Sequence, residues 1–271
     1  MTDESVHSRE PDSARARAIA ERGLILKTTV GSEVHGLSNP GTDDDDQLGV
    51  AIEPAAYLLG FQRFEHFVYR TQPDGMPSGP GDLDLTVYGL RKFCGLALKG
   101  SPTVLLPLFV TEGAFLLQRT ALGEELQSLA PAFVARSTGR AFLGYLSAQR
   151  RGLLGDREAT SRQRERSAEH GYDTKYAMHC LRIGVQGIEL LTTGRITLPV
   201  PGTDHALLRA VRSGEPELPE VLGHIDRVTA ELEAVTAEAD VPERPAIDEV
   251  DAFVTRAYRT TWDAWDEAHG T

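Results

Sequence analysis

The amino-acid sequence predicts an α+β protein, in which a small αβ domain is followed by an all-α helical bundle. Runs rich in β-branched and aliphatic residues fall in the first part of the chain, whereas the apolar spacing is helical from about residue 115 onward. The composition, with 41% hydrophobic and 25% charged residues among 271, is ordinary for a globular protein. We therefore expect a disordered N-terminus at 1–12, a first domain at 13–114 and a helical domain at 115–271.

Three strands are expected in the first domain. Residues 24–30 are aliphatic and β-branched and stop at a glycine, which predicts a buried strand ending in a tight turn. A second strand is expected at 47–52, and a third at 82–88, where apolar and polar residues alternate. Residues 54–81 have no clear pattern, and their Pro/Gly-rich run at 73–81 predicts a loop.

Helices are predicted where apolar residues recur every three or four positions between Gly/Pro-containing joints. These segments are 90–98, 130–154, 174–193, 219–235 and 247–265. The predicted helices place most of the second half of the chain in a bundle.

The charge distribution narrows the classes of partner. A net charge of −12 disfavours attraction of the whole surface to nucleic acid, which usually requires a basic face. Between Arg136 and Arg166, however, eight arginines outnumber three acidic residues. This segment is either a solvated helix face or an anion-binding surface, and the pattern favours neither.

Location and redox chemistry follow from two further observations. No apolar run reaches the roughly 18 residues that a membrane span needs, and residues 1–12 are polar and acidic, so we expect a cytoplasmic protein without membrane contact. Cys94 and Cys180 lie far apart within apolar helical patterns, which is typical of buried free thiols.

The stretch from Gly31 to Val50 places a glycine–serine turn and four consecutive aspartates between two apolar runs. The three glycines of a dinucleotide fingerprint are missing, and Gly36 is followed by leucine rather than by the lysine of a P-loop. The acidic run also lacks the central glycine of an EF-hand loop. What remains is a short anion cradle beside carboxylates, or a solvated acidic loop.

Carboxylates beside a phosphate cradle would repel the phosphate, so this combination implies an intervening hard cation such as Mg²⁺. Residues i and i+2 of a strand share a face, so Asp44 and Asp46 can coordinate one ion together. Asp84, at the start of the third strand, is the best third ligand, with Asp82 as its competitor.

Four motifs in order give the chain a family resemblance. They are the Gly31-Ser-x-x-His-Gly36 turn, Asp84 six residues before Leu90-Arg-Lys-Phe93, the run from Lys99 to Leu105, and the run from His170 to His179. Together with the pair Asp44 and Asp46, they resemble the RNA-repair-associated branch of the DNA polymerase beta superfamily of nucleotidyltransferases. The resemblance covers roughly residues 24–215 and implies a nucleotidyltransferase domain with a short mixed sheet.

The resemblance also implies roles for these residues. Asp44, Asp46 and Asp84 would hold two Mg²⁺ ions, or Mn²⁺, for an in-line displacement at the α-phosphate of a nucleoside triphosphate. Gly31 and Ser32 would hold the β- and γ-phosphates. Because Asp45 stands where a basic or aliphatic residue is usual, the pair Asp43 and Asp45 remains an alternative.

The helix that begins near Thr174 carries a polar stripe. Its residues are Lys175, His179, Arg182 and Gln186, one or two turns apart. A lysine, a histidine and an arginine in one row suit a triphosphate, and the alternative is a solvated face without a ligand. Tyr172 either stacks on the base or packs in the core, while His35 is expected to orient the glycine turn.

The sequence thus predicts a Mg²⁺-dependent enzyme that transfers a nucleoside monophosphate from an NTP, such as ATP, or a dNTP to a hydroxyl. An acceptor that is an RNA end, from a tRNA or a broken RNA, is implied by the resemblance. Transfer to a small molecule or a protein side chain is the enzymatic alternative. A protein that binds nucleotide or RNA without catalysis is the alternative from another class.

Overall fold

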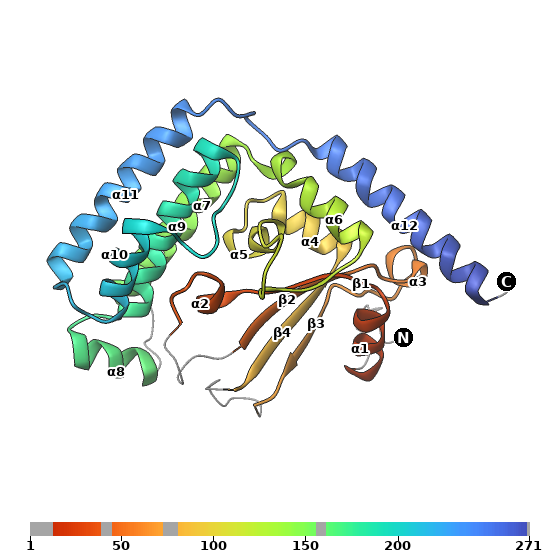
Figure 1. Cartoon of the computed structure of the whole chain (residues 1–271), viewed down its shortest axis with the longest axis horizontal. Coiled ribbons are helices and arrows are strands. Elements are labelled where there is room, and N and C mark those ends of the chain that lie inside the picture. Colours follow the sequence, from red (N-terminus) through yellow and green to blue (C-terminus); the bar gives the residue numbers. More distant parts are fainter. Residues whose placement is uncertain (1–12, 39–44, 73–80, 156–160, 270–271) are drawn as a thin grey trace, which may run out of the picture.

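The computed structural model describes residues 13–38, 45–72, 81–155 and 161–269. A sheet and a group of long helices make up the molecule, and the helices lie along one side of the sheet (Figure 1). The predicted α+β class is confirmed.

The sheet has five strands in the order β3-β4-β2-β1-β5. Their bounds are β1 (Leu24–Thr29), β2 (Asp45–Ala51), β3 (His66–Arg70), β4 (Leu83–Gly89) and β5 (Leu116–Arg119). The β2–β4 pair is parallel and the other pairs are antiparallel, so the sheet is mixed, as the resemblance implied.

Alternation along the strands gives the sheet two apolar faces. Leu48 and Val50 of β2 belong to the main core, which the helical half of the chain completes. Ala51 and Val87 belong to a smaller core under α1 (Ser13–Arg22). Because Asp46 has the parity of Leu48 and Val50, its side chain faces the same side as the helical half.

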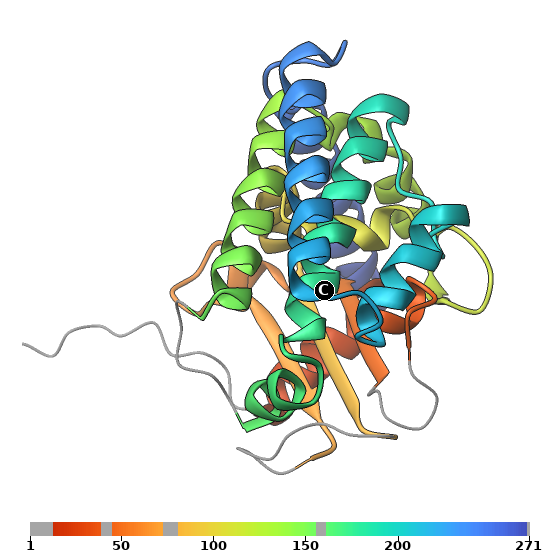
Figure 2. The same cartoon turned by 90° about the vertical axis from the view of Figure 1, so that its left-hand side faces the viewer.

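Four helices lie between strands of the sheet in sequence, namely α2 (Gly31–Val34), α3 (Ala55–Leu58), α4 (Leu90–Ala97) and α5 (Pro102–Leu105) in the described ranges. The helices that follow the sheet are α6 (Ala121–Ser128), α7 (Arg136–Leu153), α8 (Ser161–His170), α9 (Thr174–Thr193), α10 (Gly202–Arg212), α11 (Leu218–Glu238) and α12 (Ile247–His269). α7, α9 and α11 lie side by side (Figure 2). α12 crosses to the other end of the sheet (Figure 1).

Three of the expected long helices agree with the structure, whereas the one expected at 130–154 is divided, because Val134 and Ala135 are extended between a 3-10 turn at Ala130–Phe133 and α7. The helix expected at 174–193 has these bounds, and those expected at 219–235 and 247–265 extend by a few residues. Two strands were not predicted: β3 lies in the region without a clear pattern, and β5 lies where a helical pattern was expected. The predicted disorder of 1–12 and most of the predicted loop at 73–81 fall outside the described residues.

Three smaller expectations can also be compared with the structure. Cys94 and Cys180 are buried free thiols, as expected, and burial raises the pKa of each to about 12. In the arginine-rich segment, Arg140 pairs with Glu243 and Arg150 with Asp226, so these two arginines link α7 to the region of α11. Across the described ranges, none of the helices combines the length and apolar character that crossing a bilayer requires.

Candidate active site

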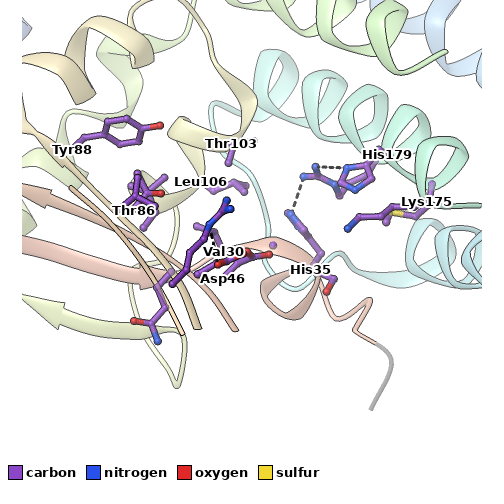
Figure 3. Close-up of a pocket in the computed structure, with 18 of the residues that line it drawn as sticks. Val30, His35, Asp46, Thr86, Tyr88, Thr103, Leu106, Lys175 and His179 are labelled. Atoms are coloured by element: carbon purple, nitrogen blue, oxygen red, sulfur yellow. Dashed lines mark hydrogen bonds and ion pairs between the residues drawn. The ribbon is translucent and has the colours of Figure 1, made fainter. Parts of the chain in front are cut away.

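A cavity of about 340 Å³ lies between the open end of the sheet and the helical half of the chain. Figure 3 shows Asp46 and His35 between Thr86 and Tyr88 of the sheet and Lys175 and His179 of α9. The other lining residues are Val30, Gly31, Ser32, Gln47, Leu48, Val68, Arg70, Asp84, Thr103, Leu106, Met178, Arg182 and Arg212. Both halves of the chain therefore build this site.

Two of the three predicted carboxylates meet in this cavity. Asp46 of β2 and Asp84 of β4 are register partners on adjacent parallel strands, which places both side chains on one face. Asp84 Oδ1 accepts a hydrogen bond from Gln72 Nε2 at 3.0 Å and lies 3.3 Å from Arg70 Nε. Asp44 lies outside the described residues.

Of the alternative pair, Asp43 and Asp45, the structure describes only Asp45. The position of Asp45 does not support this pair as the metal ligands. Asp45 is paired in register with Leu83 and does not line the cavity. Its Oδ2 accepts a hydrogen bond from Gln47 Nε2 at 2.7 Å. Asp43 lies outside the described residues.

The glycine turn is held directly against Asp46. Val30 donates its backbone N–H to the carbonyl of Asp46 at 2.8 Å, which locks the end of β1 to β2. Gly31 follows with φ +75°, and a Cβ at this position would collide with Asp46 Oδ2. Glycine is therefore required twice here, by the backbone conformation and by the close approach of the carboxylate. Ser32, next in the turn, also lines the cavity.

The opposite wall is the N-terminal half of α9. Asp173 caps this helix, because its side chain accepts hydrogen bonds from the backbone N–H groups of Lys175 and Tyr176. Lys175, His179 and Arg182 all line the cavity. Three of the four residues of the predicted polar stripe therefore line the cavity, whereas the fourth, Gln186, is buried and does not line it.

Among the residues that the structure describes, Arg182 is a buried cation without a carboxylate partner. Its residue is 5% exposed, and burial lowers its pKa to about 10. NH1 donates to Gln186 Oε1 at 3.0 Å and lies 2.8 Å from His35 Nε2, while NH2 lies 3.2 Å from His179 Nδ1. Within the described ranges its Nε has no hydrogen-bond partner and no acidic side chain is within ion-pair distance.

His35 connects the glycine turn to α9. The ring is 2% exposed, and its Nδ1 lies 3.2 Å from Gln186 Nε2. Burial, and then the charges of Arg182 and His179, hold the pKa of His35 well below its usual value. A neutral imidazole leaves the charge of Arg182 uncompensated while fixing the position of its guanidinium.

One predicted site residue lies elsewhere, and several lining residues were not predicted. Tyr172 is buried and does not line the cavity, and its hydroxyl donates to the carbonyl of Pro216 at 3.0 Å. The packed alternative is therefore the arrangement observed. The lining residues Arg70, Arg212 and Thr103 were missed, because Arg70 and Arg212 belong to elements that the sequence pattern did not predict.

The donor set at the carboxylates fits a hard cation. Asp46 and Asp84 present oxygen ligands on one face, which is the chemistry that Mg²⁺ prefers. Residues 45–72 and the other described ranges contain no group of three His, Cys, Asp or Glu residues able to hold a metal. A third ligand would have to come from elsewhere, and Asp44, which the sequence predicts for this role, lies outside the described residues.

A glycine turn and paired carboxylates on a mixed sheet, facing a row of cations, are the features expected of a nucleotidyltransferase. The sequence of the chain matches the model of the RNA repair pathway DNA polymerase beta family over residues 9–256. The chain therefore belongs to this family and is a nucleotidyltransferase of the polymerase beta superfamily. No curated protein matches it.

Two solved structures show distant similarity. A nucleotidyltransferase-like protein from Exiguobacterium sibiricum 255-15 is 12% identical, with a TM-score of 0.29 over 83% of this chain and 73% of that one. Spectinomycin adenyltransferase AAD(9) from Enterococcus faecialis, solved with ATP and spectinomycin, is 13% identical, with a TM-score of 0.36 over 91% and 96%. The assignment rests on the family match and not on these two structures.

Proposed function

We propose that the protein is a Mg²⁺-dependent nucleotidyltransferase that transfers a nucleoside monophosphate from an NTP or dNTP to the terminal hydroxyl of an RNA. One observation carries this proposal: Asp46 and Asp84 face the uncompensated cation Arg182 across a single cavity. A triphosphate with its metal ions matches both walls, because its phosphates need cations on one side and its metals need carboxylates on the other.

Asp46 and Asp84, with Asp44 as the third ligand, would hold the metal ions. When bound, two Mg²⁺ ions, or Mn²⁺, would polarise the α-phosphate and stabilise the attacking and leaving oxygens. Arg70, 3.3 Å from Asp84, fixes the orientation of that carboxylate. The close approach of Gly31 fixes Asp46 in the same way.

The other cavity residues would bind the phosphates. Gly31 and Ser32 hold the β- and γ-phosphates, and Lys175, His179 and Arg182 neutralise them from α9. The acceptor oxygen forms a bond to the α-phosphorus while the bond to the pyrophosphate oxygen breaks. The negative charge that leaves with the pyrophosphate then lies beside Arg182, which has no competing carboxylate partner within the described ranges.

Membership of an RNA repair family supports an RNA acceptor. The alternatives, transfer to a small molecule or protein side chain and binding without catalysis, become outcomes of one experiment. Purified protein is incubated with Mg²⁺, α-labelled NTP and an RNA with a free terminal hydroxyl, and both labelled RNA and pyrophosphate are measured.

The decisive variants are neighbours in sequence. Asp46→Asn should lower the turnover at least about a hundredfold, since an amide replaces a carboxylate required for the metal. Asp45→Asn is the matched control and should retain activity, because Asp45 faces away from the cavity. Full activity in Asp46→Asn, or an equal loss in Asp45→Asn, would contradict the assignment. Pyrophosphate release without labelled RNA would indicate another acceptor.

A further inference from the structure

The wall of the active-site cavity formed by β4 continues on the same face of the sheet to its edge at β3, where the side chains are exposed. In the β3–β4 pair, Arg70 is in register with Asp84, Val68 with Thr86, and His66 with Tyr88, so all six share one face. β3 is the edge strand, and His66, Val68 and Arg70 are exposed. A ligand bound at Asp84 can therefore extend along this face toward the exposed residues of β3.

Aromatic rings lie along this face. The rings of His66 and Tyr88 have their centroids 6.2 Å apart and are tilted by 57°. Tyr88 also lines the active-site cavity, so the pair begins at the edge of the site. Partly exposed aromatic rings are the usual stacking surface for unpaired bases.

A second cavity, of about 280 Å³, lies beyond the pair of rings. It begins directly after the rings, because its lining residue Glu65 precedes His66 and accepts the backbone N–H of Gly89, which follows Tyr88, at 3.0 Å. Its charged lining residues are the cations Arg63, Arg91, Lys92 and Lys99 and the acids Glu53 and Glu65. The large apolar residue Phe61, 93% exposed, lies in the loop that leads to Arg63.

The charge of the second cavity is opposite to that of the whole chain. The chain carries −12, whereas four cations surround this cavity with two carboxylates. Of these cations, only Lys92 has an ion-pair partner in the part of the chain that the structure describes. Glu53 is buried, and burial raises its pKa, which reduces the charge that it contributes. The cavity therefore favours an anionic ligand.

The spacing of the two cavities is fixed by β4. Arg91 follows Asp84 by seven residues, most of them in the strand, which places the first cation roughly 20 Å from the carboxylates at about 3.3 Å per residue. A stacked single strand rises about 3.4 Å per nucleotide, so about six nucleotides span this distance.

We propose that the face formed by His66, Val68 and Tyr88, together with the second cavity, is a binding track for the single-stranded end of the acceptor RNA. The terminal hydroxyl lies at Asp84, the adjacent bases stack on Tyr88 and His66, and phosphates further along the strand meet Arg63, Arg91, Lys92 and Lys99. The inference extends the proposed function, because it presupposes an RNA acceptor. Rings followed by cations match a nucleic acid better than an acidic peptide, which offers no bases to stack.

The test is RNA binding by fluorescence anisotropy, without any nucleotide, as a function of salt. The triple variant Arg91→Ala/Lys92→Ala/Lys99→Ala should bind a single-stranded RNA of about ten nucleotides roughly tenfold more weakly. The slope of log affinity against log salt should become shallower by about 2, since each phosphate contact on a single strand contributes about 0.7. A trinucleotide is too short to reach the cations and should bind both proteins alike.

The matched control is Arg195→Ala/Arg209→Ala/Arg244→Ala, which removes the same charge from exposed positions that line neither cavity. This variant should bind the longer RNA like the unmodified protein. Equal losses in the two triple variants would overturn the track, as would an unchanged affinity and salt slope in the first. Preferential binding of an acidic peptide of equal charge would assign the second cavity to a protein partner and would also overturn it.

Failure of the track can be distinguished from failure of the proposed function. If RNA receives the nucleotide but the first triple variant keeps its KM for the longer RNA, only the track is wrong. If the track binds RNA with the expected salt slope but no nucleotide is transferred to any RNA, the proposed reaction is wrong and the track stands.

Discussion

Arg182 carries a buried positive charge that no acidic side chain among the described residues neutralises. An arginine that stabilises a fold normally has a carboxylate, and removing such a partner costs about 3–5 kcal/mol. Arg182 contacts neutral groups of His35 and Gln186 instead. Its burial is therefore a cost that the free protein carries and that an anionic ligand would offset.

Replacement of Arg182 by methionine should thus separate stability from binding. The free energy of unfolding of the ligand-free protein should change by no more than about 1 kcal/mol, because the lost hydrogen bonds offset the removed burial of charge. The affinity for NTP should fall at least about tenfold, the value of a charged hydrogen bond. Urea unfolding and calorimetric titration with NTP measure the two effects, and Arg182→Lys should lie between the parent and Arg182→Met in affinity. A loss of several kcal/mol in stability would instead identify a structural arginine.

Gly31 allows a second prediction for a single residue. Gly31→Ala should destabilise the protein by about 1–2 kcal/mol, the cost of a positive φ for an L-residue. Its turnover should fall by up to about a hundredfold, because the new methyl group displaces Asp46. Gly113→Ala is the control, since Gly113 has φ +80° and no atoms near its would-be Cβ. Similar losses of turnover in both variants would show that backbone strain alone is responsible.

Among the elements, long helices were predictable and short strands were not. The apolar spacing of α9 repeats over twenty residues and ends at Gly194, whose φ of +74° closes the helix, so sequence pattern and structure agree on both bounds. β3 and β5 have five and four residues and are mostly exposed, so neither carries an apolar alternation. Their conformation depends on pairing with β4 and β1, which local pattern does not encode.

The cap of α9 is a testable feature of that element. Asp173→Ala should destabilise the protein by about 0.5–2 kcal/mol, because two backbone N–H groups lose their acceptor. The first turn carries Lys175, so fraying should also raise the KM for NTP. Asp173→Asn keeps the acceptor oxygen and should preserve most of both properties. Thermal unfolding and initial rates at varied NTP check this, and an unchanged unfolding temperature in Asp173→Ala would exclude a structural cap.

At the scale of the whole molecule, the active-site cavity unites segments that are far apart in the sequence. The sequence predicted Gly31, Asp46, Asp84 and Arg182 from local chemistry and from the family resemblance, and the fold places all four around one cavity. It could not predict Arg212, because only the packing of α10 against α9 brings that arginine to the site. Tyr172, by contrast, was predicted as a possible nucleotide-binding residue, but its ring packs in the core.

A buried carboxyl joins the two halves of the chain at the other end of the sheet. Glu53 follows β2, accepts the backbone N–H of Leu90 at 3.2 Å and is hydrogen-bonded to Tyr258 of α12. Its backbone carbonyl accepts from Trp262 Nε1 at 3.0 Å. Burial raises the pKa of Glu53 above its ordinary 4.5. The native protein therefore binds this proton more tightly than the unfolded chain does.

The pH dependence of the free energy of unfolding follows from the linkage between folding and proton binding at Glu53. The stability contributed by protonated Glu53 is fully present below pH 4.5 and is lost as the pH rises through the raised pKa. Glu53→Gln is neutral at every pH, so its unfolding free energy relative to the parent should increase as the pH rises from 4.5 toward neutrality. Urea unfolding across this range measures the difference.

Glu65→Gln provides a control of opposite sign. The hydrogen bond from Lys92 holds the pKa of the exposed Glu65 below its usual value, so its contribution is present at neutral pH and lost as the pH falls. The unfolding free energy of this variant relative to the parent should therefore decrease slightly toward neutrality. If Glu53→Gln followed the same direction as Glu65→Gln, the carboxyl of Glu53 would be stabilised as an anion, and the contact between the sheet and α12 would depend on its charge rather than on its proton.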